Sequence, residues 1–291
     1  MSKKTFYILM VFAMFAWGMS WTNMKILSEY LQTKELVFLR YSITAISSFF
    51  IVLFTRQSFK IDKKSLFIAF VTGVLTSIYT VLIFIGTKLG TAGIAGAFIN
   101  TLAPINTFLI LVLFFKRKIY KIDAIALILG FLGTILILDI WRFEYDKIFT
   151  TYNLFFIIAA WLWATLTITS SFSKKINPLV FSFYMYLFVS MLTFPFADFG
   201  SLDLLNKDTT FWVNLLFMSV VSTSIATSLY FLGVEKLGSV EVSSFMFIVP
   251  LSSILFGVVF LHEDISIWAI FGTILSIFAV YMINRIGVFR K

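Results

Sequence analysis

Long stretches without a single Asp, Glu, Lys or Arg are the feature that most limits what this chain can fold into. Ten of them follow one another along the 291 residues. A helix that crosses the hydrocarbon core of a bilayer needs about 20 mostly apolar residues. We therefore predict an all-α integral membrane protein with ten transmembrane helices, in the stretches 5–24, 41–55, 65–87, 89–115, 124–138, 148–173, 179–197, 209–234, 242–261 and 265–284.

The composition supports a membrane protein and excludes several other classes. Hydrophobic residues make up 60% of the chain and charged residues 13%, with a mean hydropathy of +0.99; a soluble domain carries about 25% charged residues. An ordinary soluble enzyme, a disordered chain and a nucleic-acid-binding protein are thereby excluded. The chain has no cysteine, which excludes disulfides, thiolate metal sites and cysteine nucleophiles.

The basic residues indicate how the predicted helices are oriented. If the N-terminus is cytoplasmic, 16 of the 23 Lys and Arg residues face the cytoplasm and 7 face outwards. Cytoplasmic loops of membrane proteins carry such an excess, and anionic lipid on that side accounts for the net charge of +9. We expect a multi-pass protein of the bacterial inner membrane with both termini in the cytoplasm.

The second half of the chain repeats the first at a distance of 146 residues. We predict two five-helix repeats, residues 1–145 and 146–291. Because five is odd, the second copy crosses the bilayer in the opposite direction, and such inverted-topology repeats are typical of alternating-access transporters. The aligned features are Trp17 with Trp163, Pro104 with Pro250 and, after a small insertion, Lys88-Leu89-Gly90 with Lys236-Leu237-Gly238.

Charged residues avoid the middle of every predicted span. The apolar residues Leu36–Leu39 extend the second span backwards, so Arg40 lies near its outer end. The single histidine, His262, lies at the outer end of the ninth. An intramembrane carboxylate that couples transport to protons is therefore not expected. Recognition of a solute is left to neutral polar and aromatic side chains.

The candidate substrate-binding residues carry aromatic, amide, hydroxyl or thioether groups. Trp17 and Trp163 fall near mid-span rather than at the interface, where tryptophan usually collects. Asn100 carries an amide that needs hydrogen-bond partners when it is buried. Packing between helices is the alternative explanation for these residues on their helix faces. The full set is Trp17, Ser20, Trp21, Tyr79, Asn100, Trp163, Thr167, Thr227, Tyr230, Ser243 and Met246.

Two prolines, Pro104 and Pro250, are expected to break helices beside this site. Each removes a backbone hydrogen bond and frees the carbonyl four residues earlier, which belongs to Asn100 or Met246. A freed carbonyl that faces a cavity can bind a ligand. A purely structural kink is the alternative.

Several short motifs recur in a fixed order along nearly the whole chain. They are Trp17-Gly18, Arg40, the two Lys-Leu-Gly motifs, the two prolines and Glu263. In these motifs the sequence resembles the drug/metabolite transporter superfamily, in its EamA-type ten-helix branch. The resemblance implies export, less often import, of amino acids and other small metabolites. The sequence departs from the family at Arg117, where the first-half counterpart of Glu263 is expected, and it lacks the glutamate that short multidrug relatives carry in their first helix.

We therefore expect a secondary transporter, an exporter of small amphipathic metabolites such as amino acids, which works by alternating access with a site near the midplane. The alternative is a membrane protein that handles lipid, as a scrambler or assembly factor, without solute transport. One histidine and scattered carboxylates make an enzyme unexpected, and no cofactor or metal is expected. The expected partners are a small-molecule substrate and the lipid bilayer, with no nucleic acid, and the protein is expected to be a monomer or a homodimer.

Overall fold

The computed structural model describes residues 3–116, 120–138, 150–172, 176–237 and 245–288, and within these ranges the protein is helical and has no strand. The helices of the first half are α1 (Lys3–Leu27), α2 (Thr33–Phe54), α3 (Lys63–Leu89), α4 (Ala92–Phe115) and α5 (Lys121–Ile137). Those of the second half are α7 (Thr151–Ser170), α8 (Pro178–Thr193), α9 (Thr209–Leu216), α10 (Ala226–Leu237), α12 (Ile248–Leu261) and α13 (Ile267–Val288).

Two kinds of less regular helix complete the second half. A π-helical segment, η5 (Phe217–Ile225), joins α9 to α10 without interruption. Three short 3₁₀ turns, η2 (Phe194–Phe196), η3 (Phe199–Ser201) and η4 (Leu204–Asn206), lead from α8 to α9.

Helix length and composition fit a membrane protein. Among the described residues, seven helical segments of 19 to 27 residues are long and apolar enough to cross a bilayer, and α12 and part of α13 form shorter apolar helices. The outside of the bundle carries large apolar side chains, such as Phe54 and Phe114, which are 80% and 76% exposed. Lipid rather than water suits such a surface, since soluble monomers rarely expose large contiguous apolar patches. The fold is that of an all-helical integral membrane protein.

Two aspartates cap the first turns of helices that begin at the ends of the bundle. Asp62 caps α3, because its carboxylate accepts hydrogen bonds from Ser65 Oγ (2.6 Å) and Ser65 N (3.0 Å). These bonds hold the pKa of Asp62 below its ordinary value of 3.8. Asp208 caps α9 in the same way, through the Phe211 amide at 2.8 Å. Each cap satisfies an amide that has no partner inside its helix.

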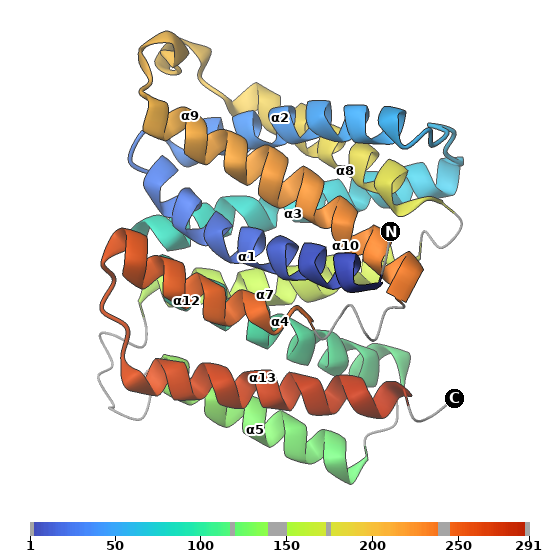
Figure 1. Ribbon diagram of the computed structural model, residues 1–291, viewed down its shortest axis with the longest axis vertical. Coiled ribbons are helices and arrows are strands. Elements are labelled where there is room, and N and C mark those ends of the chain that lie inside the picture. The colour runs from blue at the N-terminus through green and yellow to red at the C-terminus, as the bar shows by residue number, and fades with distance from the viewer. Residues whose placement is uncertain (1–2, 117–119, 139–149, 173–175, 238–244, 289–291) are drawn as a thin grey trace.

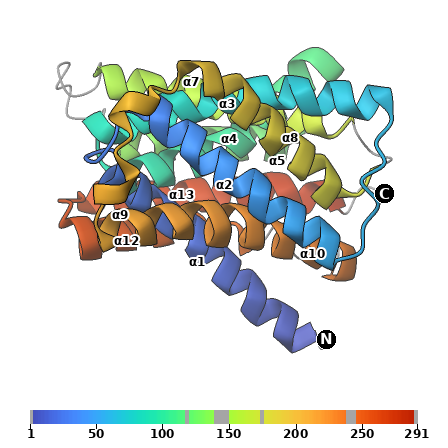
Figure 2. The ribbon, with the colours of Figure 1, turned by 90° about the horizontal axis from the view of Figure 1, so that it is seen from above.

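The helices lie side by side with their long axes roughly in one direction (Figures 1 and 2). α2 packs on α8, α4 on α12 and α5 on α13, while α1 and α3 lie on α12 and α7 respectively. α5 and α13 form one edge of the bundle, at the bottom of Figure 1. The start of α1 and the end of α13 lie at the same end of the bundle.

Glycine lets α5 and α13 approach closely at this edge. A Cβ atom built on Gly272 would lie 2.6 Å from the Gly133 carbonyl oxygen and 2.8 Å from Ile137 N. Between α4 and α12, Gly93 would meet the Ile254 Cα atom at 3.2 Å. Small residues in membrane helices permit this kind of backbone contact, so close helix packing accounts for the glycines at these two contacts.

Candidate functional site

The π-helical segment η5 is the least regular part of the described membrane helices. In it, Thr223 Oγ1 donates a hydrogen bond to Met218 O at 2.7 Å, and Ser224 Oγ donates to Ser219 O at 3.2 Å, each over five residues. The side-chain hydroxyls of Thr223 and Ser224 thus donate to backbone carbonyls one π-helical turn earlier. π-Helical turns are rare and often mark functional sites.

Helices α1 and α2 both bind this segment. Trp17 Nε1 donates to Ser222 O at 2.9 Å, and Thr44 Oγ1 donates to Ser219 O at 3.1 Å. The hydroxyls of Ser47 and Ser224 lie 2.6 Å apart. Side chains from the first half of the chain therefore hold the backbone of the second half at η5.

Trp17 lies in one cluster with two further predicted site residues, Tyr230 and Met246. Its ring centroid lies 5.4 Å from that of Tyr230 in α10, with the planes 37° apart. The Tyr230 hydroxyl lies 3.5 Å from Met246 Sδ, in the turn before α12. Trp17, Tyr230 and Met246 thus form one cluster, packed partly buried against Ala13 and other small or apolar residues.

A second aromatic pair links α3 to α7. The ring centroids of Tyr79 and Trp163 lie 5.1 Å apart, at an interplanar angle of 49°. Tyr79 is buried, whereas Trp163 is 37% exposed. Both pairs join a tryptophan and a tyrosine from opposite halves of the chain.

Arg40 is a functional candidate that the sequence analysis left out. Its side chain is only 9% exposed, although its position suggested the outer end of a span. Nη2 donates to Thr223 Oγ1 in η5 at 3.3 Å, and the guanidinium carbon lies 5.4 Å from the centre of the Tyr41 ring. A basic residue one or two turns inside an apolar run is the signal that points to such a buried charge.

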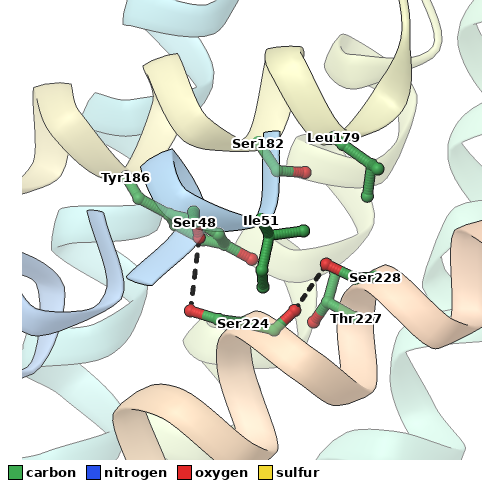
Figure 3. A pocket seen from close by; sticks show the side chains of 8 residues that line it. All are labelled: Ser48, Ile51, Leu179, Ser182, Tyr186, Ser224, Thr227 and Ser228. Carbon is green, nitrogen blue, oxygen red and sulfur yellow. Dashed lines mark hydrogen bonds between the residues drawn. The ribbon is translucent and has the colours of Figure 1, made fainter. Parts of the chain in front are cut away.

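A small pocket lies between α2, α8, η5 and α10 (Figure 3). Its polar wall is made of hydroxyl groups: Ser48 Oγ lies 3.2 Å from Ser224 Oγ, and Ser228 Oγ donates to Ser224 O at 2.6 Å. The pocket has a cavity volume of about 10 Å³, which is about the space of one water molecule and far below the roughly 300–1,000 Å³ of a typical ligand site. Its lining is Ser48, Ile51, Leu179, Ser182, Tyr186, Ser224, Thr227 and Ser228.

Thr227 is the predicted site residue that lines this pocket, while several others bond within their own helices. Ser20 Oγ donates to Trp17 O (2.7 Å) and Thr167 Oγ1 to Trp163 O (2.8 Å). Asn100 Nδ2 donates to Gly96 O at 2.7 Å. Trp21 is buried and lies against Gly96, where an added Cβ would come within 2.8 Å of its ring. Ser243 lies outside the described residues.

The two prolines occupy different positions in their helices. Pro104 lies inside α4, which continues through it from Ala92 to Phe115. Pro250 lies in the first turn of α12, where an amide has no partner inside the helix in any case. The Met246 carbonyl, which we expected Pro250 to free, accepts a bond from Val249 N at 3.1 Å.

The junction between α3 and α4 is tied to two distant helices. Glu263, after α12, accepts hydrogen bonds from the first two amides of α4, those of Ala92 and Gly93, the latter at 2.8 Å. Lys25 Nζ donates to Lys88 O and Gly90 O, both at 2.8 Å, at the end of α3. A carboxylate at a helix start and an ammonium at a helix end both complement the helix dipole.

Among the described residues, no three His, Cys, Asp or Glu side chains gather closely enough to hold a metal ion. The site is made of neutral hydroxyl, aromatic and thioether groups with one buried guanidinium. Such a lining suits an amphipathic solute.

Comparisons with known proteins identify similarity to transporters. The model of the EamA-like transporter family matches residues 4–139 and again residues 150–285. A relative from Archaeoglobus fulgidus, described as an uncharacterized transporter, is 24% identical over 282 residues, which cover 96% of this chain and 98% of the relative. A solved crystal structure aligns over 100% of both chains with a TM-score of 0.61 and 15% identity, which supports the fold alone.

Proposed function

This chain belongs to the EamA-like transporter family, and on that premise we propose that it is a secondary transporter that exports small amphipathic metabolites such as amino acids. Its site lies between α1, η5, α10 and the turn before α12, where Trp17, Tyr230 and Met246 form one cluster. The observation that carries this assignment is the hydrogen bond from Trp17 Nε1 to Ser222 O. It ties the aromatic cluster to an irregular backbone segment, and irregular backbone at membrane depth is typical of transporter sites.

The protein as proposed crosses the membrane ten times, as two inverted repeats of five helices. Equivalent helices begin 146 residues apart: α3 and α9 at Lys63 and Thr209, and α5 and α13 at Lys121 and Ile267. α4 and α12 are followed by left-handed residues at Lys116 and His262, also 146 apart. The two matches to the family model fall on either side of residue 146.

Helix packing supports a two-fold relation between the proposed repeats. α2, α4 and α5 each pack on their own counterpart, α8, α12 and α13. The contact of α1 with α12 has a counterpart in that of α7 with α4, and the contact of α3 with α7 has one in that of α10 with α1. The largest helix contacts among the described residues thus have partners when the halves are exchanged, as expected for an inverted repeat.

Alternating access follows from this architecture. When two similar halves of opposite orientation exchange conformations, a site between them opens first to one side and then to the other. Both aromatic pairs, Trp17 with Tyr230 and Trp163 with Tyr79, join the two halves, so they are where such an exchange acts. We place both termini in the cytoplasm of a bacterial cell, at the end of the bundle shared by the start of α1 and the end of α13.

Counterflow in proteoliposomes tests the proposal. The full-length protein is reconstituted and challenged with pooled labelled amino acids, nucleosides and amphipathic cations, with and without a proton gradient. We expect saturable uptake that Trp17→Ala abolishes and that Trp268→Ala preserves, since Trp268 is 41% exposed on α13. Equal uptake by Trp17→Ala refutes the site. No uptake by folded wild-type protein, together with lipid scrambling in the same vesicles, refutes solute transport.

A further inference from the structure

Arg40 presents an uncompensated positive charge inside the helix bundle. Its side chain is 9% exposed. One hydrogen bond, from Nη2 to Thr223 Oγ1, engages the guanidinium, while the fully buried Nε and Nη1 atoms have no acceptor. Nε and Nη1 carry three of the five N–H donors of an arginine.

The neighbours of Arg40 stabilise its charge only in part. The Tyr41 ring lies 5.4 Å from the guanidinium, a favourable cation–π distance. Thr223 Oγ1, which accepts from Arg40, itself donates to Met218 O. Within the described residues, no carboxylate oxygen lies within 4.0 Å of the guanidinium nitrogens. Burying a charge without a counterion is costly, and more so in a membrane.

The location of Arg40 connects the two parts of the site. Arg40 binds Thr223 and Trp17 binds Ser222, so adjacent residues of η5 carry both contacts. On the other side, the Tyr41 ring lies 5.8 Å from that of Tyr186, which lines the hydroxyl pocket. Arg40 therefore contacts the same segment, η5, that Trp17 of the aromatic cluster binds and that contributes Ser224 to the pocket.

We propose that Arg40 binds the carboxylate of the transported solute, so that this carrier selects amphipathic carboxylates, amino acids among them, over the corresponding amines. The inference rests on the proposed transport function and names the substrate class of the same site. A single carboxylate supplies the one negative charge and the acceptor oxygens that Arg40 lacks, and guanidinium–carboxylate pairs are strong. A solute that carries only an amine brings a second positive charge to the same place and is repelled.

Four full-length proteins in detergent test this assignment: wild type, Arg40→Gln, Arg40→Lys and the control Arg56→Gln, whose arginine is exposed. The probes are a pool of L-phenylalanine, L-leucine and L-methionine, a pool of the three amines that lack the carboxylate, and inorganic phosphate. Binding is read as a rise in melting temperature, and counterflow is measured with the same pools. Arg40→Lys, which keeps the charge, serves as the conservative variant.

We expect the carboxylate pool alone to raise the melting temperature of wild type and Arg56→Gln. Arg40→Gln should lose about 30-fold or more in apparent affinity, and Arg40→Lys should recover part of it. Without ligand, Arg40→Gln should melt at the wild-type temperature or above, because it removes a buried charge that has no counterion among the described residues. A structural arginine gives the opposite result, a lower melting temperature without ligand.

Several results overturn the assignment: no response of wild type to the carboxylate pool, an equal response to the amines, a response to phosphate alone, or an unchanged response in Arg40→Gln. The two proposals fail separately. Carboxylate binding that depends on Arg40 without any counterflow refutes transport and leaves the Arg40 site standing. Counterflow of amines that survives in Arg40→Gln refutes the Arg40 site and leaves transport standing.

Discussion

The indole ring of Trp17 lies 5.4 Å from the ring of Tyr230, while its Nε1 atom donates a hydrogen bond to Ser222 O at 2.9 Å. One side chain of α1 thus holds both α10 and the π-helical segment before it. Trp163, its counterpart in the proposed repeat, contacts Tyr79 in α3 and donates no such bond to a π-helical segment among the described residues. The site is therefore asymmetric, with its irregular backbone on the Trp17 side.

Trp17→Phe separates the two contacts of Trp17. Phenylalanine keeps an aromatic ring against Tyr230 but leaves the Ser222 carbonyl without its donor, which costs about 1–3 kcal/mol when the carbonyl is buried. We expect slower counterflow, by about tenfold or more, with folding retained. Trp268→Phe, on the exposed surface of α13, is the matched control. Equal rates in both variants would show that the indole N–H has no role in transport.

Glu263→Ala removes the carboxylate that caps α4. The amides of Ala92 and Gly93 lose their acceptors, and we expect a loss of about 1 kcal/mol, measured as a lower melting temperature in detergent. The neighbouring Asp264 is exposed, so Asp264→Ala should change little. If both variants melt alike, the cap contributes nothing to stability.

Gly272→Val tests the contact between α5 and α13. The new side chain would overlap the Gly133 carbonyl and the Ile137 amide, and forced overlap in a packed interior costs about 1–3 kcal/mol. We expect a clear fall in melting temperature. Gly200→Ala is the control, since a Cβ atom there meets only Asp198 Oδ1, at 3.4 Å. A stable Gly272→Val protein contradicts this packing.

Acid should weaken the hydrogen bonds of Asp208, which caps α9 and accepts from the Tyr30 hydroxyl. The Phe211 amide and then the Tyr30 hydroxyl hold the pKa of Asp208 below its usual 3.8. A lowered pKa in the folded state stabilises the fold above the unfolded value and ceases to do so as the pH falls through the folded one. Hydrogen exchange at the Phe211 amide should speed up beyond its intrinsic rate between about pH 5 and pH 3. Asp208→Asn should remove this pH dependence. If exchange of the Phe211 amide in the wild-type protein follows its intrinsic rate over this pH range, the prediction is wrong.

The sequence predicted several of the helical segments, because charged residues mark where apolar helices must end. The stretch 65–87 lies inside α3, and 124–138 differs from α5 by a few residues. Trp17, Tyr230 and Met246, predicted from their side-chain chemistry, lie in one cluster. Choosing these residues required only the residue types and the helix faces on which they lie.

Three features of the site depend on tertiary contacts and were not predictable. η5 is rich in serine and threonine, but its π-helical form depends on side chains of α1 and α2 that bind its carbonyls. Glu263 reaches Ala92 across 171 residues of sequence. The apolar run around Arg40 is a signal of burial, but its contact with Thr223 depends on the packing of α2 against η5.

Single-cysteine labelling tests alternating access most directly, because the chain has no cysteine of its own. Thr227→Cys reports on the pocket, Ser58→Cys on the connection between α2 and α3, and Leu205→Cys on the turns before α9. A membrane-impermeant maleimide is applied to right-side-out and to inside-out vesicles. We predict that Leu205→Cys reacts only in right-side-out vesicles, Ser58→Cys only in inside-out vesicles, and Thr227→Cys in both. Reaction of Thr227→Cys from one side only would contradict a site that opens alternately to the two faces.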